Sequence, residues 1–208
     1  MNELENLMAR YPALLGCSDD IVSAFNALLR MFKDGGKLMI AGNGGSAADC
    51  EHIAGELLKS FKTKRPICSD ASDALTEKYG EAGTELARKL EGALPAIPLP
   101  SIVSLNTAFA NDVDPAVAFA QLTIGLGSKG DVLLAISTSG NAQNVINAVM
   151  AANAVGVKTI GLSGASGGKL SGLCDIMIRV PSEETYAIQE YHLPVYHALC
   201  AMLESELF

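Results

Sequence analysis

The three histidines of the chain lie near carboxylate or amide side chains. His52 stands four residues before Glu56, so a helix would place both side chains on one face. His192 and His197 share the last apolar periodic segment with Gln189. A carboxylate and an imidazole facing one sugar phosphate could interconvert an aldose and a ketose, because one moves the proton beside the carbonyl through an enediol and the other passes a proton to oxygen. A structural role for each single histidine is the competing interpretation.

A glycine-rich stretch, residues 41–49, precedes these groups and joins an expected strand, 37–40, to an expected helix, 50–61. Unpaired backbone N–H groups and the helix dipole make such a turn an anion site. Ser46 and Asp49 stand where N-terminal cap or first-turn residues belong. The stretch is neither a dinucleotide fingerprint nor a P-loop, since its third glycine is missing and no Gly-Lys-Ser/Thr follows. An ordinary tight turn is the alternative.

A second polar turn, Ser137-Thr138-Ser139-Gly140-Asn141, follows the expected strand 131–136 and precedes the expected helix 142–155. Its three hydroxyls and its backbone N–H groups suit a phosphate without an obligatory lysine. A serine-rich helix cap would give the same pattern. Convergence with the glycine turn on one sheet edge favours the phosphate site.

The elements that must position these residues form repeated units of strand, short polar turn and helix, which predict a mostly parallel sheet covered by helices on both faces. Ligands of such sheets bind at the carboxyl ends of the strands, where both turns fall. The expected strands are 37–40, 97–103 at an edge, 131–136, 158–162 and 176–180. The expected helices are 3–15, 20–33, 50–61, 71–92, 104–110, 114–127, 142–155, a short one at 169–173, and one from 181–185 to about residue 206, with a turn at 111–115.

Length and composition limit the class of protein. A chain of 208 residues fits one α/β domain, and a 49% hydrophobic composition suggests large subunit interfaces. No apolar run is long enough for a membrane span, and the acidic start, residues 1–5, lacks a signal-peptide pattern. The net charge of −8 argues against nucleic-acid binding. Five scattered cysteines without a CxxC pair indicate reduced thiols, and we expect a cytoplasmic enzyme.

Four segments together resemble the sugar-isomerase (SIS) domain, most closely the phosphoheptose isomerase family. They are residues 42–49, 52–56, 136–141 and 188–192, with His197 beyond, and the resemblance spans roughly 20–62 and 100–206. It implies a single domain, 1–208, with a five-stranded parallel sheet in a flavodoxin-like three-layer sandwich, N-terminal helices over 1–35 and a helical insertion at about 67–96. It also implies a homotetramer that converts sedoheptulose 7-phosphate to D-glycero-D-manno-heptose 7-phosphate for bacterial surface glycans.

The resemblance also implies roles for individual residues. Glu56 corresponds to the base that moves the C2 proton, and His197 to its partner acid. Some relatives bind zinc through the positions of His52, Glu56, Gln189 and His197, so one zinc ion per subunit is a possible cofactor. The implied substrate-binding residues, mostly for the phosphate, are Asn43, Gly44, Gly45, Ser46, Asn111, Asp112, Ser137, Thr138, Ser139, Asn141 and Gln189.

The spacing of Gln189 and His197 suggests active sites between subunits. Eight residues of straight helix span about 12 Å, so one small ligand could hardly contact both side chains. We therefore expect one of them to reach the site of a neighbouring subunit.

Three departures from the family leave the exact sugar open. Ser60 stands where an arginine usually follows the catalytic glutamate, with Lys59 and Lys62 nearby, and Ala142 replaces a common serine. The insertion from Ile67 to Ala96 could be a lid, an interface pad or a decoration. An isomerase of another phosphosugar, and a non-catalytic protein that binds the replication initiator or senses sugar phosphates, remain alternatives. The presence of Glu56 favours catalysis, because initiator-binding relatives lack that glutamate.

Overall fold

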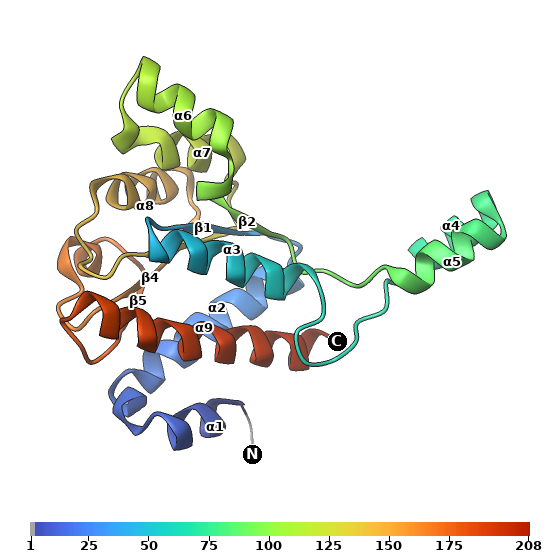
Figure 1. Ribbon diagram of the computed structural model, residues 1–208, viewed down its shortest axis with the longest axis horizontal. Coiled ribbons are helices and arrows are strands. Elements are labelled where there is room, and N and C mark those ends of the chain that lie inside the picture. The colour runs from blue at the N-terminus through green and yellow to red at the C-terminus, as the bar shows by residue number, and fades with distance from the viewer. Residues whose placement is uncertain (1–2) are drawn as a thin grey trace.

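A computed structural model describes residues 3–208 and shows a central sheet between two layers of helices (Figure 1). All neighbouring strands in the described chain run parallel, in the order β2-β1-β3-β4-β5. This is the order of flavodoxin-like doubly wound folds, so the predicted five-stranded parallel sheet is confirmed. The strands are β1 (Leu38–Ala41), β2 (Ala96–Pro98), β3 (Val132–Ile136), β4 (Lys158–Ser163) and β5 (Ile176–Arg179).

The strand order reverses between β1 and β3, and the two polar turns follow these two strands. Ala41 at the end of β1 pairs with Ala135 near the end of β3, so the glycine turn and the Ser137–Asn141 turn leave the sheet side by side. Such a switch point is where open α/β sheets bind ligands. The predicted convergence of the two turns on one sheet edge is therefore confirmed.

Alternate residues of the buried strands supply two separate cores. Leu38 and Ile40 face one cluster, with α1 (Glu3–Arg10), α2 (Ser18–Lys33), α3 (Gly45–Leu58) and α9 (Thr185–Leu207). Met39 and Ala41 face the other, with α6 (Val103–Asp112), α7 (Ala118–Leu126) and α8 (Gln143–Val155). The side-chain period of two in a strand gives this division. It puts the two helices that carry the histidines, α3 and α9, in the same layer.

The N-terminal helix is shorter than the predicted 3–15. The α-helix α1 ends at Arg10, and a 3₁₀ segment, η1 (Pro12–Cys17), follows it. The cause is Pro12, since a proline disfavours helical backbone in the residue before it. The next helix, predicted over 20–33, begins two residues earlier, at Ser18, and no side chain caps it.

The insertion is a hairpin of two helices, so the single helix predicted over 71–92 is wrong. α4 (Ser69–Tyr79) and α5 (Glu81–Lys89) meet at Gly80, whose φ of +60° only glycine adopts easily. Figure 1 shows the hairpin projecting from the body as an arm. Pro66 and Glu91 form an isolated antiparallel bridge at its base. We call residues 67–90 the insertion arm.

Four smaller predictions also need correction. The edge strand predicted over 97–103 is shorter in the structure. It is β2, which ends at Pro98, where the 3₁₀ segment η2 (Leu99–Ser101) follows. α6 continues through Asp112, so the predicted turn begins later, at Val113. The predicted helix 114–127 starts as the 3₁₀ segment η3 (Pro115–Val117), and the predicted short helix at 169–173 is the 3₁₀ segment η4 (Gly168–Gly172). Within residues 3–208, none of the helices has the length and apolar character that crossing a membrane requires.

Candidate active site

The glycine turn leads directly from β1 into α3. Gly44 caps the helix with a φ of +55°, and α3 begins at Gly45, earlier than the predicted Cys50. Ser46 is buried in the first turn, whereas Asn43 is exposed. The Asn43 amide exchanges two 2.8 Å hydrogen bonds with the amide of Asn144, in the first turn of α8. This pair ties the glycine turn to the helix that follows the second turn.

The second turn presents hydroxyls of graded exposure at the N-terminus of α8. Ser137 is buried, Thr138 half-buried and Ser139 exposed. The side chain of Asn141 braces the turn, since its Nδ2 donates to the Ser139 carbonyl (2.9 Å) and its Oδ1 accepts from the backbone N–H of Lys169 (3.1 Å). The turn is therefore preorganised, which lowers the cost of holding an anion there.

One turn further along α3, His52 and Glu56 meet His197 of α9. His52 Nε2 lies 3.2 Å from Glu56 Oε1 and 3.3 Å from His197 Nε2. The three side chains offer ligand atoms within 4.8 Å of one another. Glu56 Oε2 is buried and has no hydrogen-bond partner among residues 3–208, although Lys59 Nζ lies 3.6 Å away. An unpartnered buried carboxylate oxygen beside two imidazoles fits a proton-transfer site or a cation site.

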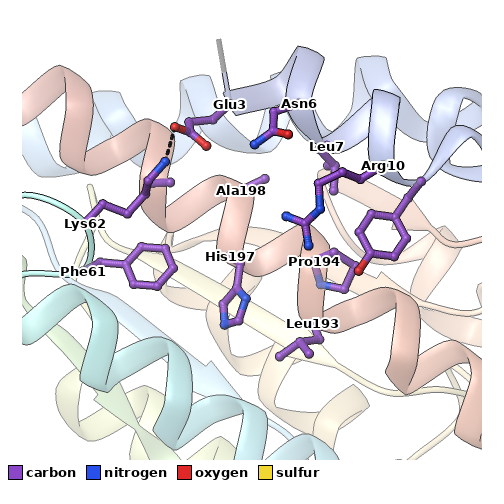
Figure 2. A pocket seen from close by; sticks show the side chains of 12 residues that line it. Glu3, Asn6, Leu7, Arg10, Phe61, Lys62, Leu193, Pro194, His197 and Ala198 are labelled. Atoms are coloured by element: carbon purple, nitrogen blue, oxygen red, sulfur yellow. Dashed lines mark hydrogen bonds and ion pairs between the residues drawn. The ribbon is translucent and has the colours of Figure 1, made fainter. Parts of the chain in front are cut away.

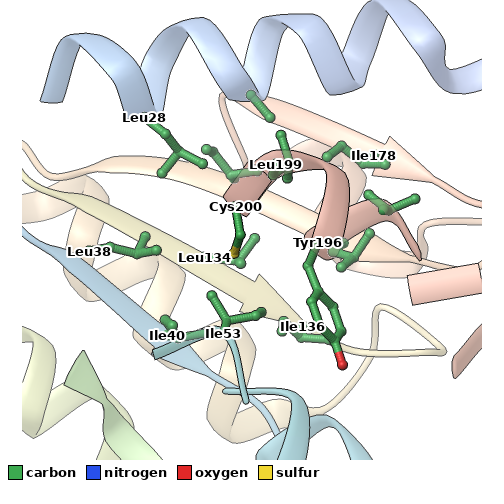
Figure 3. Close-up of a cluster of buried hydrophobic side chains, with 14 of the residues drawn as sticks. Leu28, Leu38, Ile40, Ile53, Leu134, Ile136, Ile178, Tyr196, Leu199 and Cys200 are labelled. Carbon is green, nitrogen blue, oxygen red and sulfur yellow. The ribbon is translucent and has the colours of Figure 1, made fainter. Parts of the chain in front are cut away.

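Tyr196 connects this triad to the interior, and the sequence analysis did not identify it. Its ring packs in the main core with Cys200 and Leu199, and Figure 3 shows its hydroxyl at the rim of that cluster. The hydroxyl lies 3.1 Å from Asp49 Oδ1 and 3.1 Å from His52 Nδ1. Tyr196 directly precedes His197, so the position was visible, but only tertiary structure brings Asp49 to it.

Gln189 lies at the glycine turn instead of at the triad. A Cβ atom built on Gly45 would come within 2.4 Å of Gln189 Nε2, so the amide covers the start of α3. α3 and α9 run in the same direction, which takes Gln189 to the turn and His197 to the triad within one chain. The sharing of sites between subunits stays a prediction.

Two expected substrate-binding residues lie in the other helix layer. Asn111 and Asp112 are exposed at the end of α6, and their side chains bond to each other (Asn111 Nδ2 to Asp112 Oδ1, 2.7 Å). α6 packs on the sheet face opposite α3 and α9. The structure therefore does not join them to the triad, and their role in substrate binding stays a prediction.

Of the two departures from the family pattern near the site, Ser60 has a structural explanation and Ala142 has none. Ser60 donates from its backbone N–H and its hydroxyl to the carboxylate of Glu91 (each 2.8 Å), and so anchors the base of the insertion arm. Ala142 is the N-cap residue of α8 and makes no side-chain cap bond. The cation 3.6 Å from the Glu56 carboxylate is Lys59, a point charge without the planar donor geometry of arginine.

Burial shifts the acidities of several groups around the triad. Burial and the neighbouring His52 lower the pKa of His197, against the opposing effect of Glu56. Burial raises the pKa of Asp49, against hydrogen bonding from Tyr196 and the nearby His52. His197 is therefore neutral near pH 7, where it can donate one N–H proton and accept another.

A cavity of about 330 Å³ opens beside His197, between α1 and α9 (Figure 2). Arg10 and Lys62 contribute positive charge to its lining, and Lys62 is ion-paired with Glu3. Phe61 covers one side. The cavity leaves room next to the imidazole, and Arg10 is a lining residue that the sequence analysis did not single out.

A doubly wound sheet with two polar turns at its switch point, and with the cluster of His52, Glu56 and His197 further along α3, fits an α/β protein of the SIS-domain class. Residues 104–205 match the SIS domain. The phosphoheptose isomerase of Aliarcobacter butzleri is 39% identical over 91% of this chain and 86% of its own length, and that of Coxiella burnetii is 36% identical over 98% and 90%. The chain belongs to the phosphoheptose isomerase family.

Solved structures agree with this assignment. Phosphoheptose isomerase GmhA from Neisseria gonorrhoeae superposes with a TM-score of 0.75 at 32% identity, covering 97% of this chain and 94% of its own. The phosphoheptose isomerase from Francisella tularensis gives a TM-score of 0.78 at 30% identity, covering 97% and 93%. Each of these structures covers nearly all of this chain, so the resemblance stated from the four sequence segments is confirmed.

Proposed function

We propose that this chain is an aldose–ketose isomerase that converts sedoheptulose 7-phosphate to D-glycero-D-manno-heptose 7-phosphate, for bacterial surface-glycan heptose. The observation that carries the proposal is the meeting of Glu56, His52 and His197 beside two anion-binding turns on one sheet edge. The names of the relatives and solved neighbours support the choice of sugar.

The base in this proposal is Glu56. It removes a proton from the carbon next to the carbonyl, C1 of the ketose or C2 of the aldose, and returns it to the other carbon after the enediol forms. Its Oε2 atom suits this task, because it is buried and makes no hydrogen bond among the described residues. Low solvation leaves its lone pairs available for carbon acid chemistry.

The partner acid is His197. The enediol needs a proton moved between O1 and O2, and a neutral imidazole can give one proton and take another. The lowered pKa of His197 supplies that neutral form near pH 7.

The phosphate is held at the two turns. Ser137, Thr138 and Ser139 with the backbone of α8 supply donors from one side. Asn43, Ser46 and the N-terminus of α3, with Gly44 and Gly45, supply them from the other. Hydrogen bonds and two helix dipoles then balance a dianion without a lysine. Gln189 stands over the glycine turn, where its amide can orient the sugar chain.

A zinc ion fits the triad. His52, Glu56 and His197 supply two imidazoles and a carboxylate, a ligand set that zinc accepts. Gln189, the fourth expected ligand, lies at the glycine turn of its own chain, so it would reach a zinc ion at a triad only from a neighbouring subunit. Bound zinc would polarise the substrate carbonyl. The assembly proposed is a homotetramer, in the cytoplasm, with sites at subunit interfaces.

The test is turnover of sedoheptulose 7-phosphate in the native chain and in Glu56→Gln, with zinc supplied. The matched control is Glu51→Gln, which removes a charge from an exposed face of the same helix. We expect turnover in the native chain and the control, and a loss of at least about 10³-fold in Glu56→Gln. Turnover of only a sugar phosphate of another chain length would move the assignment to that sugar. No turnover in a folded, zinc-supplied protein would favour a binding protein.

A further inference from the structure

Tyr196 joins two residues of α3 that lie three positions apart. Its side chain, on α9, is 1% exposed, and its hydroxyl lies 3.1 Å from both Asp49 Oδ1 and His52 Nδ1. Asp49 and His52 share one face of α3 because of their spacing, and the tyrosine reaches that face between them. We propose that Tyr196, anchored by Asp49, is a positioning residue that fixes the tautomer of His52; the inference rests on the proposed function only for its effect on catalysis.

The direction of the two hydrogen bonds follows from the groups. An ionised carboxylate can only accept, so the Tyr196 hydroxyl donates its one proton to Asp49. The tyrosine oxygen is then left to accept, and its other neighbour is His52 Nδ1. His52 must therefore carry its proton on Nδ1. Its Nε2 atom, on the far side of the ring, keeps a lone pair.

That lone pair is directed into the triad. His52 Nε2 lies 3.2 Å from Glu56 Oε1, which is also an acceptor, and 3.3 Å from His197 Nε2. Acceptors that face one another at this distance need a proton or a cation between them. While the hydrogen bonds from Tyr196 to Asp49 and from His52 Nδ1 to Tyr196 are intact, His52 cannot donate a hydrogen bond from Nε2 to Glu56. The lone pair of Nε2 therefore stays available to a metal ion or to a proton in transit.

Asp49 is suited to hold the tyrosine. Its Oδ2 atom is buried and makes no hydrogen bond within residues 3–208, so the bond from Tyr196 to Oδ1 is a main compensation for burying this carboxylate. The Tyr196 ring belongs to the same buried cluster as Cys200 and Leu199, and it points from α9 toward the edge of that cluster (Figure 3). Locked packing of this kind is what a residue that orients a ligand needs.

The decisive variant is Tyr196→Phe, which removes the hydroxyl and keeps the ring. Solid-state NMR of protein labelled with ¹⁵N only in its three histidines reports the tautomer of His52, and His52→Gln assigns its signals. We expect the zinc-free native chain to show the Nδ1–H form and Tyr196→Phe to shift to the Nε2–H form. Zinc affinity, measured by competition with a chelating dye, should fall roughly 10- to 100-fold.

Two Asp49 variants keep the test valid if Tyr196→Phe folds poorly. Asp49→Asn retains an oxygen that accepts from the tyrosine and should keep the native tautomer, whereas Asp49→Ala should lose it. Isomerase assays should show a lower kcat with an unchanged KM in Tyr196→Phe and Asp49→Ala, because the phosphate-binding turns are untouched, and a kcat near the native value in Asp49→Asn. An Nε2–H form in the native chain overturns the proposal, as does zinc affinity within twofold of native in both Tyr196→Phe and Asp49→Ala. Since tautomer and affinity are measured without sugar, failure of the proposed activity would be seen separately.

Discussion

Arg65 and Glu204 form an ion pair that is closed to solvent at the end of α3. Arg65 Nε lies 2.8 Å from Glu204 Oε1, and the side chains are 1% and 3% exposed. The guanidinium also donates to the backbone carbonyls of Glu56, Leu57 and Lys59, which end the helix. Glu204 accepts the backbone N–H groups of Phe61, Lys62 and Thr63. One pair therefore ties the last turn of α3, which carries the candidate base, to α9.

Replacing Arg65 with methionine should be strongly destabilising. The variant leaves Glu204 as a buried charge and leaves three helix carbonyls without their donor, so we expect a loss of about 3 to 5 kcal/mol in the free energy of unfolding. Urea denaturation measures this loss. Lys64→Met, at an exposed neighbouring position, is the matched control and should change stability little. A loss below about 1 kcal/mol in Arg65→Met would contradict the importance assigned to the pair.

Gly45→Ala should damage substrate binding without unfolding the chain. The new Cβ would stand 2.4 Å from Gln189 Nε2, so the amide must leave the glycine turn. We expect a higher KM for the sugar phosphate and a lower kcat/KM. Gly55→Ala is a control in the same helix, where a Cβ meets nothing within 4 Å. It should keep activity and gain up to about 1 kcal/mol of stability from helix propensity. Equal kinetics in the two variants would remove Gln189 from the site.

The buried imidazole of His192 should make stability fall in mild acid. Burial lowers its pKa from 6.5 to about 4, and the nearby backbone of Ser163 offsets only part of that shift. His192 is then protonated below pH 6.5 in the unfolded chain but only below about pH 4 in the folded chain. Above pH 6.5 His192 does not make the free energy of unfolding depend on pH. As the pH falls from 6.5 to 4, its effect lowers the free energy of unfolding by about 3 kcal/mol.

The measurement is the free energy of unfolding of the native chain and of His192→Phe across this pH range. The other titrating groups are shared, so the difference between the two curves isolates the histidine. It should be flat above pH 6.5 and should favour the variant increasingly below it. A difference that does not depend on pH would show that His192 takes up a proton as readily in the folded protein as in the unfolded chain.

The sheet and the paired turns were predictable because they depend on local patterns. Val132 to Ile136 is an uninterrupted apolar run, and the small polar residues after it belong at a strand end. The i, i+4 spacing of His52 and Glu56 also fixed their common face. Tyr196 and Arg65 could not be found in this way. Tyr196 contacts Asp49 and Arg65 contacts Glu204, and each of these partners is more than 100 residues away in the sequence. Neither Tyr196 nor Arg65 stands out from its neighbours by residue type.

The single helix predicted over 71–92 was wrong for a related reason. The helical composition is real on both sides of Gly80, but one positive φ is enough to reverse the chain. Gly83 then packs in the hairpin, where a Cβ would overlap the Leu75 carbonyl. The sequence alone does not reveal this contact, because Gly83 meets Leu75 only after the chain folds back.

Removing the insertion arm should leave the α/β body folded. The buried residues of the arm's helices are Gly83 and Ala87, both in α5, and α4 has none. The arm is held at its base, where Ser60 bonds to Glu91 and the backbone N–H of Gly92 donates to the Arg65 carbonyl. The bridge between Pro66 and Glu91 already brings the ends of the arm together, so a linker of a few glycines can replace residues 67–90.

We expect this deletion to change the free energy of unfolding by less than about 1 kcal/mol, because it removes little buried apolar surface and shortens a closed loop. Thermal and urea denaturation test this, and the matched control is Glu91→Gln in the full chain, which weakens the anchor and keeps the arm. Isomerase activity should persist, since the triad and both turns lie outside the arm. Retained stability with lost activity would make the arm a part of the active site, and a smaller assembly on gel filtration would make it a subunit contact.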